Sequence, residues 1–298
     1  MIFGLELGGT KCLALRAEGR QIVECVSVPT TDPDATLGAI DALFGGWCAQ
    51  RQPDALGIAS FGPVGVDRDR ADWGFMLQTP KAGWAGADIA GRYRRLLGVD
   101  IGFDTDVNAA ALAEARWGEA IGTSCNAYVT LGTGVGVGIV VQGNPVHGRL
   151  HPEFGHLKAR RMPGDRFKGN CPFHGDCIEG LVSGPAIAQR AGMPGEHIED
   201  DHPVWSGVIH DLGALLASLI LAVSPEKIAL GGGIACARPW LVERARRAAV
   251  SSLGGYLEGL SNDIDAIIGM TTLGKHAGPL GAIALGLAAR AGGDCSTI

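Results

Sequence analysis

The stretch Leu5-Glu6-Leu7-Gly8-Gly9-Thr10-Lys11-Cys12-Leu13 has the pattern of two short strands joined by a tight turn. Apolar residues over 3–7 and 12–16 favour the strands, and the two glycines between them favour the turn. The same device returns in the second half, where Gly132-Thr133-Gly134 separates two further predicted strands. Two halves that begin in the same way indicate two similar lobes.

Strand and helix signals alternate along most of the chain, which favours an α/β fold. The strands are predicted over 3–7, 12–16, 55–60, 99–104, 126–131, 135–142, 227–230 and 265–270, and the helices over 33–50, 107–117, 207–223, 239–252 and 279–291. We therefore predict two similar lobes, 1–118 and 119–298, with a cleft between them. The last helix, about 279–298, is expected to pack back on the first lobe.

Length and charge exclude several classes of protein. A chain of 298 residues is long enough for two domains, and its net charge of −6 disfavours binding to nucleic acid or to an anionic membrane. The longest apolar run, Leu212 to Ser224, is too short to span a bilayer and predicts a buried helix. The first residues lack a basic or long apolar segment, so we expect no secretory signal and a cytoplasmic location.

Glycine-rich turns after strands can hold phosphate, because bare backbone N–H groups approach its oxygens closely. The P-loop pattern is absent, and the chain after Gly134 alternates apolar residues with period two, so it continues as a strand and not as the helix of a dinucleotide fingerprint. A phosphate held at a hairpin turn is the arrangement of actin and hexokinase. One such turn is a weak signal, but two, together with a glycine triplet after 227–230, predict a nucleotide site at Gly8, Gly9, Thr10, Lys11, Gly132, Thr133, Gly134, Gly231, Gly232 and Gly233.

A carboxylate pair lies between the strand predicted over 99–104 and the following Ala-rich helix. A carboxylate at a strand end can project into a cleft and accept the proton of a hydroxyl during phosphoryl transfer. Asp106 is the candidate for that role, and the alternative is that it only caps the helix. Asp104 fits either a cleft or the protein surface.

Four metal ligands cluster in one loop. His156 is followed by Cys171, His174 and Cys177 at spacings that fit a tetrahedral zinc site, and four protein ligands would make that zinc structural. The alternative is two unlinked thiols and two ordinary histidines. The other cysteines show no such spacing and are expected to be core or surface thiols: Cys12, Cys25, Cys48, Cys125, Cys236 and Cys295.

Taken together, these motifs resemble those of the ROK sugar kinases, and within them the bacterial magnesium-dependent fructokinases. The resemblance covers almost the whole chain. The matching motifs are Leu7 to Lys11, Pro29 to Pro33, Gly57 to Pro63, Thr79 to Lys81 with Trp84, Phe103 to Leu112, Val146 to His156, and Cys171 to His174.

The resemblance implies an ATP- and Mg²⁺-dependent kinase that converts D-fructose to fructose 6-phosphate, acts as a homodimer and belongs to the hexokinase/actin ATPase superfamily. It implies that Asp106 is the base. It also implies that zinc, bound in the loop 156–177, shapes the sugar pocket from behind without joining the chemistry. The residues implied for the sugar site are Gly62, Asn108, Glu153, His156 and Glu179.

Three residues depart from the wider family. Glu6 stands where most ROK kinases have Asp, although the fructokinase branch resembles this chain there. Thr105 replaces an Asn of the glucokinase-like branch, which argues against glucose. Val137 replaces a Gly of the second phosphate turn, at a position expected to point into the core.

Other functions are compatible with the same fold. A kinase for glucose, mannose or another hexose would differ in a few pocket contacts. A sugar-sensing ROK repressor would carry an N-terminal helix-turn-helix, whereas this chain enters its first predicted strand at residue 3. A metal-stabilised binding module without catalysis would give no reason for Asp106 to accompany both phosphate turns.

Overall fold

The computed structural model describes residues 1–257 and 259–292, so Cys295 and the end of the last predicted segment lie outside the described residues. The chain divides into two compact units. The first contains Met1–Trp117, Gly138–Pro152 and the chain from Lys275, and the second contains Gly118–Val137 and Glu153–Gly274. The predicted lobe limits, 1–118 and 119–298, stay a prediction, and each unit is described by itself.

The first unit is built on a five-stranded mixed sheet. The strand order is β3 (Gln21–Pro29), β2 (Lys11–Glu18), β1 (Ile2–Leu7), β4 (Ala55–Ser60) and β5 (Asp100–Thr105). Strands β1, β4 and β5 are parallel and in register, with Leu7 beside Ser60 and Ser60 beside Thr105. The residues that follow these three strands therefore emerge at the same edge of the sheet.

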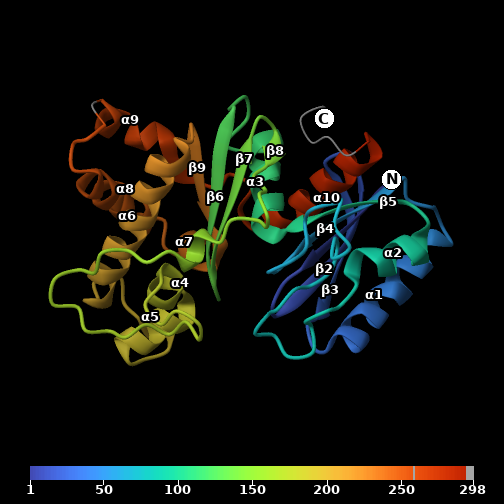
Figure 1. The fold of residues 1–298 in the computed structure, drawn as a ribbon, viewed down its shortest axis with the longest axis horizontal. Helices are drawn as coiled ribbons and strands as arrows, with labels where there is room; N and C mark the ends of the chain where they lie inside the picture. The colour runs from blue at the N-terminus through green and yellow to red at the C-terminus, as the bar shows by residue number, and fades with distance from the viewer. Residues whose placement is uncertain (258, 293–298) are drawn as a thin grey trace. The chain divides into compact units, whose positions relative to one another are not determined.

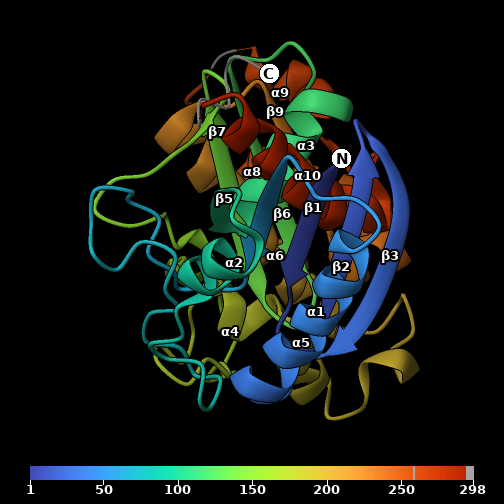
Figure 2. The same cartoon turned by 90° about the vertical axis from the view of Figure 1, so that its right-hand side faces the viewer.

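Helices cover both faces of this sheet. Helices α1 (Pro33–Cys48) and α2 (Ile89–Leu97) lie on one face, and α10 (Ala277–Arg290) and α3 (Asp106–Trp117) lie on the other (Figures 1 and 2). Helix α10 approaches the sheet closely because β4 carries a glycine at the contact. A Cβ atom at Gly57 would lie 1.8 Å from the carbonyl oxygen of Ala282.

The second unit contains the parallel strands β10 (Ile268–Met270), β9 (Lys227–Gly231) and β6 (Cys125–Leu131), beside β7 (Val135–Val141). The sheet continues to β8 (Asn144–Pro145), and the division between the units falls within β7. The helices of this unit are α4 (Ile178–Val182), α5 (Gly184–Ala191), α6 (Val204–Val223), α7 (Gly232–Ala237), α8 (Trp240–Leu253) and α9 (Leu260–Ile267). Two mixed sheets layered with helices confirm the predicted α/β class.

Most predicted elements are confirmed to within three residues at either end. The strand predicted over 265–270 is wrong in its first half, because Asp265 to Ile267 belong to α9 and the strand begins at Ile268. A short apolar run does not by itself distinguish the end of a helix from a strand. The elements that were not predicted are strands β3 and β8 and helices α2, α4, α5, α7 and α9. Val137 is buried, as expected.

Helix α6 corrects one expectation. Its 20 residues, with a mean hydropathy of 1.8, are long and apolar enough to cross a membrane by length and composition. The expectation that the run is too short is therefore wrong, because the helix begins eight residues before Leu212, at Val204. Nevertheless, 56% of its most apolar window is buried inside the protein. Its fully buried Asp211 accepts a hydrogen bond from Arg190 of α5 at 3.0 Å, so α6 is a core helix, as predicted.

Candidate active site and metal centre

The first predicted phosphate turn joins β1 to β2. Gly8 N–H donates to the Lys11 carbonyl at 3.1 Å, which closes the turn. In the described part of the chain the N–H groups of Gly9 and Thr10 donate to no acceptor, and both residues are exposed. The turn therefore offers two free backbone donors to solvent, which is the requirement for anion binding.

Two side chains from distant segments support this turn. Thr30 donates its hydroxyl to the Gly8 carbonyl at 2.7 Å. The ammonium group of Lys81 donates to the Gly9 carbonyl at 2.6 Å. The loop that carries Lys81 is anchored by Trp84, which is fully buried and donates its indole N–H to the Thr31 carbonyl at 2.8 Å.

Two carboxyl groups lie beside the turn at the same sheet edge. Glu6 is the penultimate residue of β1, and its Oε2 is buried without a hydrogen-bond partner in the described chain. Burial raises the pKa of Glu6 to about 7, and the charge of Asp106 adds to this effect while Lys11 opposes it. Burial also raises the pKa of Asp106 to about 6, although the hydrogen bond from the backbone N–H of Val107 lowers it. An unpartnered buried carboxylate oxygen beside a second carboxylate fits the oxygen ligand set of Mg²⁺.

Asp106 was predicted either to accept a proton or only to cap the following helix, and its position distinguishes these two roles. Helix α3 begins at Asp106 itself, and Thr105 supplies the cap, since its Oγ1 accepts a hydrogen bond from Asn108 N–H at 3.1 Å. The predicted N-cap at Asp106 is therefore wrong by one residue. Asp106 Oδ1 accepts from Val107 N–H at 2.9 Å, while Oδ2 accepts no hydrogen bond in the described residues. One carboxylate oxygen of Asp106 is thus available to another molecule.

Asn108, which was predicted to contact the sugar, has a different place. Its side chain is 1% exposed. Its Nδ2 donates to Asp104 Oδ1 at 2.8 Å, and its Oδ1 accepts from Ile139 N–H at 3.2 Å. We therefore correct this prediction, because a buried amide engaged at both ends cannot reach a ligand. Asp104 is itself buried and lines a cavity of the first unit, so it does not lie on the protein surface. Gly62, which is half-buried, lies two residues after the end of β4.

The charge of Glu6 provides a test of this environment. The protonated form is favoured in the folded state, because the pKa of Glu6 rises from 4.5 to about 7 on folding. The stabilisation by the neutral form is complete below pH 4.5 and is lost as the pH rises through 7. We expect Glu6→Gln to stabilise the nucleotide-free, EDTA-treated protein by roughly 2 kcal/mol at pH 8. At pH 5 we expect little gain. Urea unfolding at both pH values tests this, and equal effects would contradict the assigned pKa.

The second predicted turn, in the other unit, has the same open geometry. Gly132 N–H donates to the Gly134 carbonyl at 3.0 Å, and the Gly132 carbonyl accepts from Gly184 N–H at 2.7 Å. The N–H groups of Thr133 and Gly134 have no acceptor within the described chain. Glu179, predicted to hold a sugar hydroxyl, directs Oε2 to Val135 N–H at 3.1 Å and so supports this turn.

The glycine triplet lies beside the second turn. Strand β9 ends at Gly231, and α7 begins at Gly232. Gly232 has a φ of +83°, and a Cβ atom there would lie 2.4 Å from the Leu131 carbonyl oxygen, so no larger residue fits. At Gly233 an added Cβ atom would meet nothing within 4 Å. The triplet thus packs against the end of β6 and leaves Gly233 open to a ligand.

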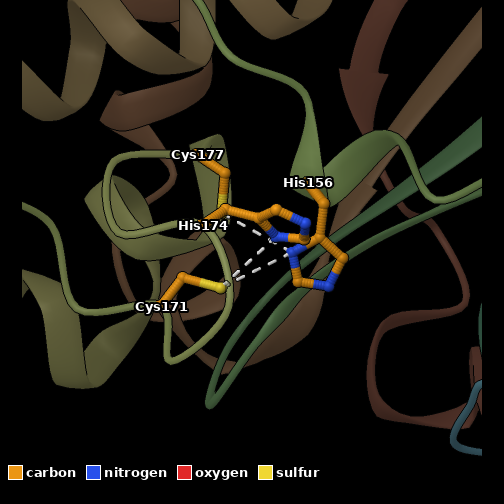
Figure 3. Close-up of side chains that lie close together, drawn as sticks. All are labelled: His156, Cys171, His174 and Cys177. Atoms are coloured by element: carbon orange, nitrogen blue, oxygen red, sulfur yellow. Dashed lines mark hydrogen bonds between the residues drawn. The ribbon is translucent and has the colours of Figure 1, made fainter. Parts of the chain in front are cut away.

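The four predicted metal ligands lie together (Figure 3). Their ligand atoms lie within 4.8 Å of one another. Cys171 Sγ is 3.8 Å from His156 Nδ1 and 3.7 Å from His174 Nδ1, and Cys177 Sγ is 3.5 Å from His156 Nδ1. A tetrahedral zinc ion with ordinary bond lengths places sulfur and nitrogen ligands about 3.6 Å apart. The donor set and its spacing therefore fit zinc.

His156 connects this cluster to its surroundings. It ends the short 3₁₀ helix Phe154–His156, which exposed Glu153 precedes. Its Nδ1 faces the two thiols, whereas its Nε2 points away from the cluster (Figure 3). One imidazole could thus bind metal through Nδ1 and a second ligand through Nε2.

Ion pairs also hold the loop between His156 and Cys171. Arg190 of α5 pairs with Asp165 of the loop and with Asp211 of α6. Arg161 pairs with Asp165 at 2.6 Å, and Lys158 pairs with Asp176 at 2.9 Å. Both Asp165 and Arg190 are less than a tenth exposed, so these contacts are shielded from solvent. The loop therefore has an anchor besides the four metal ligands.

Comparison with known proteins gives consistent matches over the full length. The model of the ROK family matches residues 2–289. The fructokinase of Zymomonas mobilis is 40% identical to this chain over 295 residues, which cover 97% of each chain. The fructokinase of Pediococcus pentosaceus is 38% identical over 291 residues, which cover 97% of this chain and 99% of that protein. A solved structure of a ROK family glucokinase from Streptomyces griseus, in complex with glucose and AMPPNP, is 26% identical with a TM-score of 0.77 and covers 96% of this chain and 99% of that one. These matches confirm the family resemblance and the fold expected from it.

Proposed function

This chain belongs to the ROK family, and we propose that it is a fructokinase that transfers the γ-phosphoryl group of ATP to D-fructose, giving fructose 6-phosphate and ADP. The observation that carries the proposal is the Asp106 carboxyl group. It projects from the sheet edge next to an open phosphate turn, has one free oxygen, and has a pKa of about 6. A general base works best with a pKa near the working pH, so this carboxylate suits a hydroxyl acceptor.

In the proposed mechanism the two glycine turns hold the nucleotide phosphates through free N–H groups. The turn after β1 uses Gly9 and Thr10, and the turn before β7 uses Thr133 and Gly134. Gly233 offers an open surface to the adenosine. Glu6, beside Asp106, would hold Mg²⁺. When bound, this ion neutralises charge on the phosphates.

The chemical step requires one proton transfer. Asp106 Oδ2 accepts the proton of the fructose hydroxyl while the hydroxyl oxygen forms a bond to the γ-phosphorus of ATP. At the same time the bond between that phosphorus and the leaving oxygen of ADP breaks. The proton then leaves Asp106 for solvent. We propose that Gly62, Glu153, the Nε2 side of His156 and the second carboxylate oxygen of Glu179 hold the remaining sugar hydroxyls.

The metal cluster completes the proposal. His156, Cys171, His174 and Cys177 would bind structural zinc, which orients His156 toward the sugar. We further propose a homodimeric, cytoplasmic enzyme without a nucleic-acid or membrane partner. These features follow from the family and from the acidic composition.

A hexose panel tests the proposed substrate. ADP release with Mg²⁺ and ATP is measured with fructose, glucose, mannose and galactose as acceptors. We expect kcat/KM for fructose to exceed each other value by at least about tenfold, since a few pocket hydrogen bonds separate hexoses by 1–3 kcal/mol. Higher kcat/KM with glucose or mannose would assign a different hexose. No ADP release with any acceptor would contradict a kinase.

A further inference from the structure

Asp104 is a buried carboxylate in the penultimate position of β5, two residues before Asp106. Its side chain is 3% exposed and accepts three hydrogen bonds. Oδ1 accepts from Thr105 N–H at 2.7 Å and from Asn108 Nδ2 at 2.8 Å, and Oδ2 lies 2.8 Å from His147 Nε2. A buried carboxylate requires such compensation, since its desolvation is otherwise costly.

His147 is the side-chain partner of Asp104 Oδ2. It follows β8 in the segment Gly138–Pro152, which belongs to the same unit as Asp104. Its side chain is 30% exposed and lines, with Asp104, a cavity of about 460 Å³, so packing on that side does not hold the imidazole. Burial disfavours the imidazolium, but the hydrogen bond to Asp104 and the charges of Asp104 and Asp67 outweigh burial and raise the pKa of His147. Asp104 therefore favours the protonated imidazole, and in that form the hydrogen bond is charge-assisted.

A second set of contacts joins the same segment to the start of α3. Asn108 Oδ1 accepts from Ile139 N–H at 3.2 Å. At Gly138 an added Cβ atom would lie 2.0 Å from the Val107 carbonyl oxygen, so the two backbones are in direct contact. Residues 104, 107 and 108 are thus each contacted by the segment Gly138–Pro152. The side chain of Asp106 between them bonds only to its neighbour Val107 in the described chain.

We propose that Asp104 and His147 are a positioning pair that holds the β5–α3 junction, and thereby orients the carboxylate of Asp106 toward the acceptor hydroxyl. The proposal depends on the proposed function, in which Asp106 is the base. Neither member of the pair needs to touch substrate. A base displaced by about 1 Å can lose about a hundredfold in rate, because proton transfer requires hydrogen-bond reach.

Two substitutions at His147 separate positioning from bulk packing. His147→Leu removes the donor, and we expect kcat to fall by about 10- to 100-fold. The KM values for fructose and ATP should stay within about threefold, because binding groups are untouched. His147→Gln places an amide N–H near the position of Nε2 and should recover most of the lost kcat. His202→Leu, at another half-buried histidine, is the matched control and should leave kcat unchanged.

The outcomes distinguish this proposal from the proposed function. If the Asp106→Asn enzyme turns over fructose normally, Asp106 is not the base, and the proposed role of the Asp104–His147 pair is refuted with it. An inactive Asp106→Asn with a normal kcat in His147→Leu would overturn the pair alone, as would a His147→Gln variant no better than His147→Leu. If His147→Leu does not fold, Asp104→Asn replaces it, and there an unchanged kcat overturns the pair while a loss of about tenfold with unchanged KM supports it.

Discussion

Asp106→Asn is expected to lower kcat for fructose by about 10² to 10⁴-fold, the range that a general base contributes. Asparagine has the same shape and keeps the oxygen that accepts from Val107 N–H, but it cannot take a proton. ADP binding should be nearly unchanged, because the turn at Gly9 and Thr10 does not include this side chain. Steady-state kinetics and calorimetric titration with ADP measure the two effects.

The control for this variant is a surface carboxylate. Asp69→Asn removes a charge from an exposed loop residue of the same unit and should leave kcat and ADP affinity at wild-type values. An Asp106→Asn enzyme that keeps more than about a tenth of wild-type kcat would contradict the assigned base. Loss of ADP binding together with kcat would instead indicate that the variant disturbs the nucleotide site.

The local parts of the site could be predicted from the sequence because their chemistry is local. A Gly-Gly-Thr turn between two apolar strands restricts the backbone wherever it occurs. The His156 and Cys171 to Cys177 spacing likewise fixes a ligand set before any packing is known. The alignment of β1 and β5 then follows from the parallel order of the sheet, which places Glu6 and Asp106 at one edge.

The side chains that hold the first turn and the β5–α3 junction in place could not be predicted, because they come from segments far away in the sequence. Lys81 lies 72 residues from Gly9, and His147 lies 43 residues from Asp104. The motif Thr79-Pro80-Lys81 with Trp84 indicated that the segment matters, but no spacing rule assigns its ammonium group to the first turn. Asn108 was misassigned for the same reason, since its partner Ile139 is distant.

The geometry of α4 extends the role predicted for the metal. Cys177 is the residue immediately before α4. Glu179, within α4, accepts a hydrogen bond from the N–H of Val135, which follows the second glycine turn. Gly184, after α4, donates its N–H to the carbonyl of Gly132, which belongs to that turn. A helix of five residues is too short to be stable alone and depends on its anchors. A metal ion at Cys177 would therefore support the second turn through α4, in addition to orienting His156.

Cys177→Ser is accordingly expected to lose bound zinc, lower the unfolding temperature and weaken ADP binding by about tenfold, since removing one of four ligands leaves an incomplete site. Metal analysis, thermal unfolding and titration with ADP measure these effects, and none requires turnover. Cys236→Ser, at an exposed thiol of the same unit, is the matched control and should retain zinc and ADP affinity. Zinc-free wild-type protein purified without chelators would refute the metal centre. Zinc loss with normal ADP affinity would show that the Arg190–Asp165 anchor alone holds α4 and the turn.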